Sequence, residues 1–135
     1  MTNKISESKM RFLTLIKLDA TRLFERLAGR RVEYLNLFAL KRTREPFDAV
    51  FASKFDQVQL SELGQCSEEL IVAIDQFYAE VEQLKWYLYH TEDMPGTIDD
   101  ELNRALKRIG RYFEDLMLML KVEIDLAKES AYSDD

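Results

Sequence analysis

The residues of this chain that could carry out chemistry are few and far apart. There is one histidine, His90, and one cysteine, Cys66, beside 25 Asp and Glu residues. Helical di-iron sites need Glu-x-x-His pairs that face inward, but the residue three positions before His90 is Tyr87. No two glutamates are three positions apart, and the near match, Glu45-x-x-Asp48, is interrupted by a proline. The sequence therefore predicts no metal site and no cofactor.

A cysteine–histidine pair also fails as a catalytic unit. Such a pair needs hydrogen-bond contact to activate the thiol. Cys66 and His90 fall on one predicted helix, which separates them by roughly 36 Å at about 1.5 Å per residue. We interpret Cys66 as a small buried residue and His90 as an exposed helix-end residue. We assign no catalytic residue and expect no enzymatic activity.

One short stretch points to an alternative function. Lys85-Trp-Tyr-Leu-Tyr-His90 resembles the Arg-x(4–6)-His motif of the HEPN helical-bundle ribonucleases and their relatives. The likeness covers six residues and departs at its first position, where Lys85 replaces the family's arginine. The resemblance implies an RNA-cleaving dimer, or a toxin–antitoxin component, with Lys85 and His90 at the cleft.

A group of cations follows the first long run of helical periodicity, and it could contact an anion or a charged partner. The dipole of a preceding helix would also favour its later members without any ligand. The chain has a net charge of −6 and a pI near 4.9, so we do not expect a nucleic-acid partner. The group consists of Arg30, Arg31, Lys41, Arg42 and Arg44.

Charge is divided unevenly along the chain. Residues 1–46 carry 11 Lys/Arg and 5 Asp/Glu, a net charge of +6, whereas residues 47–135 carry 8 and 20, a net charge of −12. The basic part could pack beside acidic helices within the monomer or across a dimer. Alternatively, one pole of the molecule binds a charged partner. The acidic part would also suit an immunity protein that covers a basic toxin surface.

Apolar residues at steps of three and four predict an all-α fold. Only four glycines and two prolines are present, which favours few and long elements. We expect one domain over residues 1–135, with frayed ends at 1–8 and 130–135. The predicted architecture is an antiparallel bundle of three long helices, at about 9–44 with a kink or break near 29, at 61–90 and at 97–128, plus a short helix near 47–58.

Local signals set these boundaries. The residue before Pro46 is pushed away from helical angles, which ends the first helix. Gly64 could interrupt the second helix, which would then restart at Ser67. Thr97, with Asp100 three positions on, resembles a capping box and would start the last helix.

A second apolar line runs along the predicted helix 61–90. When Leu60 takes position a of a heptad, Val72, Ala79 and Trp86 all fall at position f, opposite the core seam, with Tyr89 beside Trp86. A solvated face would carry charge at these positions. An exposed Trp–Tyr patch is typical of a partner-binding anchor. The alternative is that a fourth helix or a second copy covers the line permanently.

These observations favour a non-enzymatic interaction protein, namely a small acidic adaptor, chaperone-like or regulatory protein. Its partner would be another protein or a second copy, as in a homodimer. The longest dense apolar run, 116–120, is far too short to span a membrane, and no secretory leader is evident. We therefore expect no membrane association and a cytoplasmic location, where a single cysteine stays reduced.

Overall fold

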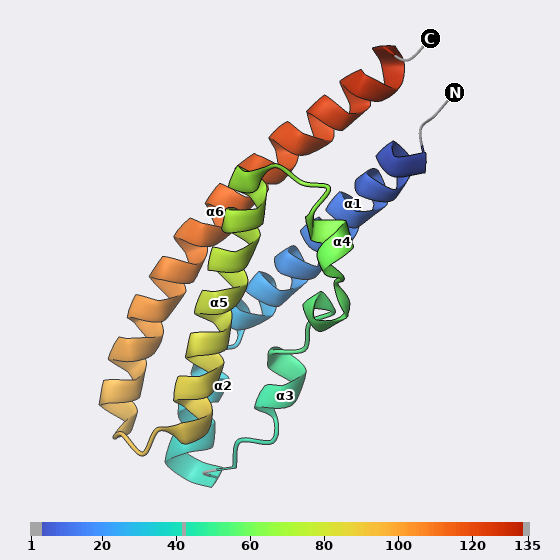
Figure 1. Cartoon of the computed structure of the whole chain (residues 1–135). Coiled ribbons are helices and arrows are strands. Elements are labelled where there is room, and N and C mark those ends of the chain that lie inside the picture. Colours follow the sequence, from blue (N-terminus) through green and yellow to red (C-terminus); the bar gives the residue numbers. More distant parts are fainter. Residues whose placement is uncertain (1–3, 42, 134–135) are drawn as a thin grey trace.

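The computed structural model of the chain describes residues 4–41 and 43–133. All regular secondary structure in these ranges is helical, so the all-α prediction is confirmed (Figure 1). In chain order the elements are α1 (Lys4–Gly29), α2 (Arg31–Asn36), a π-helical turn (Leu37–Lys41), α3 (Phe47–Val50), a 3-10 turn (Phe55–Gln57), α4 (Leu60–Leu63), α5 (Glu68–His90) and α6 (Pro95–Ser133).

The longest helix, α6, is the one against which both α1 and α5 pack. A short turn joins α5 to α6, and the two helices run antiparallel, while α1 runs along another side of α6 with its N-terminus near the C-terminus of α6 (Figure 1). Fully buried apolar residues at helical spacing form the seam of α6 and explain this central place. They are Ile98, Leu102, Ile109, Leu116 and Leu120.

Aromatic side chains fill the space where the three long helices meet. Phe113 of α6 stacks on Phe24 of α1 at 4.5 Å between ring centroids and lies 5.8 Å from Phe77 of α5. Phe77 is fully buried. These rings therefore link both α1 and α5 to α6.

The predicted kink near residue 29 is present, since α1 ends at Gly29 and α2 begins at Arg31. Tyr34 closes the break, because its buried hydroxyl donates a hydrogen bond to the carbonyl oxygen of Leu27 at 3.3 Å. The ring of Tyr34 lies edge-on to Phe47 of α3 at 5.6 Å. The break therefore directs the chain across the end of the bundle.

The prediction of one short helix over 47–58 was wrong. α3 ends at Val50, and an irregular connection over residues 51–59 follows it, with a single 3-10 turn. Side chains of α1 replace the missing helical hydrogen bonds. Arg26 Nε donates to the carbonyl of Val50 at 3.1 Å, and Arg26 also donates to the carbonyl of Ala52.

The predicted helix 61–90 is two helices, so the alternative of a break at Gly64 is confirmed. α4 ends at Leu63, and α5 begins after Ser67, whose hydroxyl oxygen accepts a hydrogen bond from the Leu70 amide at 3.3 Å. This N-cap satisfies one of the free amides at the start of α5.

Both chain ends are more helical than predicted. α1 begins at Lys4, and α6 starts at Pro95 and continues to Ser133. Fraying of residues 1–8 and 130–135 stays a prediction. Residues 1–3 and 134–135 lie outside the described residues. Proline suits the first position of a helix, because its missing amide has no helical partner there.

A buried carboxylate, Glu123 of α6, links these ends to α5. Its oxygen Oε2 lies 3.0 Å from Lys9 Nζ, and the residue is 6% exposed. Burial alone would raise the pKa of Glu123, but its polar neighbour Ser67 and the charge of Lys9 outweigh it and hold the pKa below its ordinary value. Burial, followed by the nearby Glu123 charge, raises the pKa of the Cys66 thiol to about 11.

The lowered pKa of Glu123 predicts a pH dependence of stability. A carboxylate of this kind stabilises the fold above its unfolded pKa, and the contribution is lost as pH falls through the folded pKa. We expect the free energy of unfolding to decrease below about pH 4.3, the ordinary pKa of glutamate, and Glu123→Gln to show a smaller decrease. At neutral pH this substitution should lower the stability by about 1–3 kcal/mol.

Urea unfolding at pH 7 and at a series of values below pH 4.3 measures this effect. Glu114→Gln is the matched control, because Glu114 is exposed on the same helix. Identical pH profiles for the native protein and Glu123→Gln would contradict the prediction.

Candidate functional site

The outer face of α5 is the line formed by Val72, Ala79 and Trp86. Val72 is 52% exposed and Trp86 is 66% exposed, and Ala79 is also exposed. Their seven-residue spacing places them on one side of the helix, opposite the core residues such as Phe77 and Leu84. In the part of the chain that the structure describes, no other helix covers this line.

The charged residues beside this line are mostly acidic. Lys85 is the one lysine or arginine of α5, and it is half-buried. The outer face of α5 is therefore an apolar line with an acidic border, which complements a basic surface. The exposed acids of α5 are Glu68, Glu69, Asp75 and Glu82.

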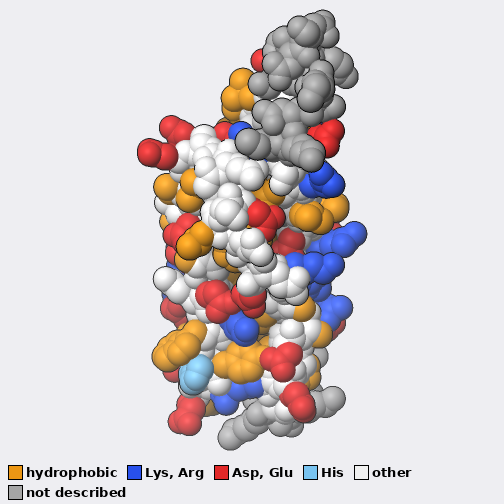
Figure 2. Space-filling view, turned by 45° about the vertical axis from the view of Figure 1, so that its right-hand side comes forward, with side chains coloured by type: hydrophobic (Ala, Val, Ile, Leu, Met, Phe, Trp, Pro, Cys, Tyr) orange, Lys and Arg blue, Asp and Glu red, His pale blue; other side chains and the backbone are white. Residues whose placement is uncertain are grey.

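Trp86 is held in place by its neighbour one helical turn further on. The rings of Trp86 and His90 stack at 4.6 Å between centroids, and His90 Nδ1 lies 2.9 Å from the Trp86 carbonyl oxygen. Figure 2 shows the histidine in pale blue next to hydrophobic side chains on the molecular surface. A stacked indole has less freedom to lose on binding, so this tryptophan is a pre-ordered anchor.

Tyr89 does not share this exposure, although it was predicted to belong to the same patch. Its hydroxyl donates a hydrogen bond to Asp48 Oδ1, and its ring lies edge-on to Phe47 at 5.9 Å. Burial, followed by the bond to Asp48, raises the pKa of Tyr89 to about 12. Tyr89 therefore ties α5 to α3, and only Val72, Ala79 and Trp86 form the exposed line.

The described members of the predicted anion-contact group, Arg30, Arg31 and Arg44, have different surroundings. Arg44 Nε donates to the Leu88 carbonyl at 3.1 Å, and Arg44 also donates to the carbonyl of Thr91. These carbonyls lie at the C-terminal end of α5, where helical partners are missing. Arg44 therefore serves the fold as a cap.

The other members of this group also differ in role. Arg31 is paired with Asp99 of α6 at 2.7 Å, whereas Arg30 is exposed. The side chain of Lys41 and all of Arg42 lie outside the described residues.

Lys85 and His90, the pair behind the HEPN resemblance, lie in the last turns of α5. A step of five residues turns a helix by about 140° beyond a full turn, so the two side chains leave α5 in different directions. Lys85 is half-buried, and His90 is stacked on Trp86. RNA cleavage by this pair stays a prediction.

Over residues 4–41 and 43–133, no three His, Cys, Asp or Glu side chains come together to hold a metal ion. Cys66 and His90 lie at opposite ends of α5. None of the described helices is long and apolar enough to cross a membrane.

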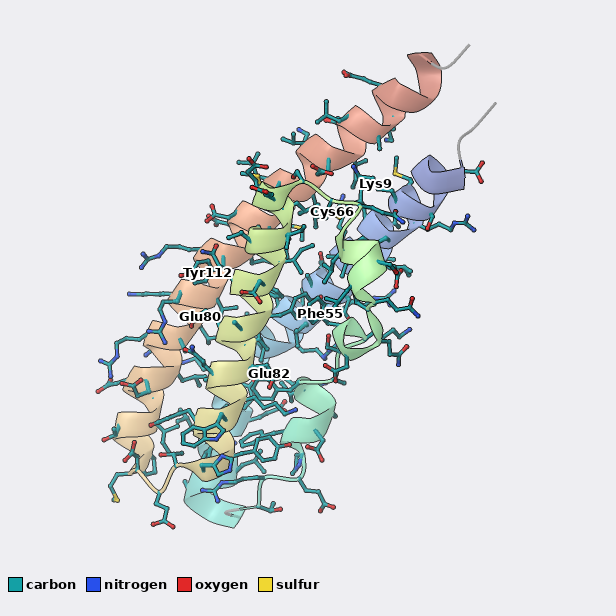
Figure 3. The ribbon with its side chains drawn as sticks, in the orientation of Figure 1. Lys9, Phe55, Cys66, Glu80, Glu82 and Tyr112 are labelled. Atoms are coloured by element: carbon teal, nitrogen blue, oxygen red, sulfur yellow. The ribbon has the colours of Figure 1, made fainter. Side chains whose placement is uncertain are left out.

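A second surface, the α1 groove, was missed from the sequence. It is a groove of about 460 Å³ between α1 and the 51–59 connection. Phe55, from the connection, lies beside α1 in Figure 3. A signal was present, because Leu15 and Leu18 lie off the main apolar stripe of their helix. Its principal lining residues are Leu15, Leu18, Arg22, Lys54, Phe55 and Val58.

Asp19 of α1 fixes the wall of this groove. Its carboxylate accepts hydrogen bonds from Ser53 Oγ at 2.7 Å, the Lys54 amide at 2.9 Å and the Tyr78 hydroxyl at 2.6 Å. Phe55 stacks on Tyr78 at 4.0 Å between ring centroids. Burial, followed by the bond to Asp19, raises the pKa of Tyr78. The groove is therefore formed before any partner arrives.

No protein-family model, curated protein or solved structure matches this chain. Its function must therefore follow from its own surfaces. Two surfaces of the described residues stand out, the outer face of α5 and the α1 groove.

The structural role of Arg44 gives a direct prediction. Arg44→Ala should lower the free energy of unfolding by about 1–3 kcal/mol, because two carbonyls at the end of α5 lose their donor. Arg30→Ala, the matched control, should change it by less than about 0.5 kcal/mol, because Arg30 is exposed. Urea unfolding of the two variants measures the difference, and equal effects would show that Arg44 is not a cap.

Proposed function

We propose that this protein is a non-enzymatic interaction module that binds a basic protein surface through the outer face of α5. The observation that carries the proposal is the exposure of Trp86, at 66%, on a line with Val72 and Ala79. Tryptophan is highly buried on average in folded proteins, and it is among the residues most often found at binding hot spots.

The dimensions of the outer face suit a helical partner. Val72 and Trp86 are 14 positions apart (86 minus 72), which gives a line of about 21 Å at 1.5 Å per residue. That length corresponds to about four turns of a partner helix. The small side chain of Ala79, at the middle of the line, leaves room for close approach. Helix-on-helix docking is therefore the binding mode that we propose.

The acidic border supports the choice of a basic partner. Opposite charges speed association and exclude wrong partners more than they add affinity, so the apolar line would supply most of the binding energy. Burying a large apolar side chain contributes about 1.5–3 kcal/mol. An adaptor, chaperone-like or regulatory role fits such a surface, and an immunity protein that covers a basic toxin would be one form of it.

We also propose a cytoplasmic location and no enzymatic activity. The single cysteine, Cys66, is buried and has a raised pKa, which keeps the thiol protonated and unreactive at neutral pH. The partner is either another protein or a second copy of this chain, as in a homodimer.

Photo-crosslinking in the source cell tests the proposed function. A photoreactive residue at position 79 should capture a protein whose yield falls by at least about tenfold with Trp86→Ala, as expected for a hot-spot residue worth about 2 kcal/mol. Glu82→Lys should also reduce the yield. Circular dichroism checks that both variants stay helical.

Position 107 of α6 provides the control, because Lys107 is exposed and lies outside the outer face of α5. A photoreactive residue there should not capture the same protein. Capture from position 79 that is no stronger than from position 107, or that persists in Trp86→Ala, would refute the proposed function.

A further inference from the structure

The α1 groove carries charge opposite to that of the outer face of α5. Arg22 and Lys54 are exposed and line the groove. In the part of the chain that the structure describes, neither of them forms an ion pair. In Figure 2, Lys and Arg side chains gather on the right-hand side of the visible face.

The acids of the groove are occupied within the fold. Asp19 accepts three hydrogen bonds, from Ser53, Lys54 and Tyr78. Glu62 Oε1 accepts a hydrogen bond from the Gln59 amide at 3.2 Å as part of the cap of α4. These donors are neutral and leave both carboxylates charged, so the lining has three cations, Arg22, Arg26 and Lys54, against two acids, a net charge of +1 (3 minus 2).

The groove also offers apolar surface. Leu15 is 61% exposed and Leu18 is 45% exposed, and Phe55 and Val58 line the opposite wall. Grooves of this kind accept the apolar side of an amphipathic helix. The occupant that matches this groove is a helix with an apolar line and an acidic border.

This chain contains such a helix. We propose that the outer face of α5 of one copy docks into the α1 groove of a second copy. The inference rests on the proposed function and names its partner as the chain itself. Trp86 and Val72 would cover Leu15 and Leu18, and acids such as Glu82 would face the cations of the groove.

The net charge of −6 does not prevent this contact. At physiological ionic strength, charges more than about 8 Å apart are largely screened, so the local match between the two surfaces decides the outcome. If two copies each place their outer face of α5 in the other's groove, they form a closed symmetric dimer. If each copy binds a different neighbour, larger oligomers form. Every contact in both assemblies joins an α1 groove to an outer face of α5.

Trp86 gives a direct readout, because it is the one tryptophan of the chain. Sedimentation and tryptophan emission are measured together from about 1 µM to about 1 mM. Association should rise with concentration, and the emission should shift to shorter wavelengths as Trp86 leaves water. Arg22→Glu and Glu82→Lys should each weaken association by at least about tenfold.

A mixture of the two variants supplies the decisive comparison. Arg22→Glu keeps a native outer face of α5, and Glu82→Lys keeps a native groove, so the mixture should form heterodimers where each variant alone is monomeric. Lys107→Glu, a charge reversal at an exposed position of α6, should associate as the native protein does. Urea unfolding of each variant excludes loss of the fold.

Three results would overturn the inference: a monomer over the whole range, association without a shift of Trp86 emission, or a mixture that stays monomeric. A monomer would leave the proposed function standing if crosslinking from position 79 captures a different protein. Absence of any specific crosslink from that position would remove the proposed function as well.

Discussion

The packing of α1 and α5 on one shared helix, α6, is the constraint on which the rest of the structure depends. The fully buried seam of α6 serves both neighbours, and Phe113 reaches between them to contact Phe24 and Phe77. Because α5 has one long partner, it needs one apolar stripe for the core. A second apolar line on its far side therefore adds nothing to the described fold and is free for another role.

The same constraint accounts for the α1 groove. The 51–59 connection contacts both α1 and α5, and polar groups anchor it there. Asp19 binds the connection and Tyr78, and Arg26 binds the carbonyls that end α3. Buried and partly buried polar groups must find partners, so these bonds fix an irregular segment that hydrophobic contact alone would leave undefined.

The sequence predicts the parts of this molecule that depend on local periodicity. The helical hairpin of α5 and α6 and the break near Gly29 follow from spacing and turn residues. Spacing also places Trp86 on the far side of its helix, but only the structure shows that it is exposed. The errors concern side chains that reach distant partners. Tyr89 binds Asp48, 41 positions away, and Arg44 caps Leu88, 44 positions away. The same limit hid the groove, whose two walls come from separate parts of the chain.

The fold pairs only part of the uneven charge of the sequence within one molecule. Ion pairs join α1 and α2 to α6, through Lys9 with Glu123 and Arg31 with Asp99. Among the described residues, no ion pair joins α1 to α5. The remaining cations of α1 and the acids of α5 face outward on different sides, because both helices turn their apolar stripes toward α6. The packing that builds the core therefore keeps these opposite charges from neutralising each other within one molecule and leaves them available for contacts between molecules.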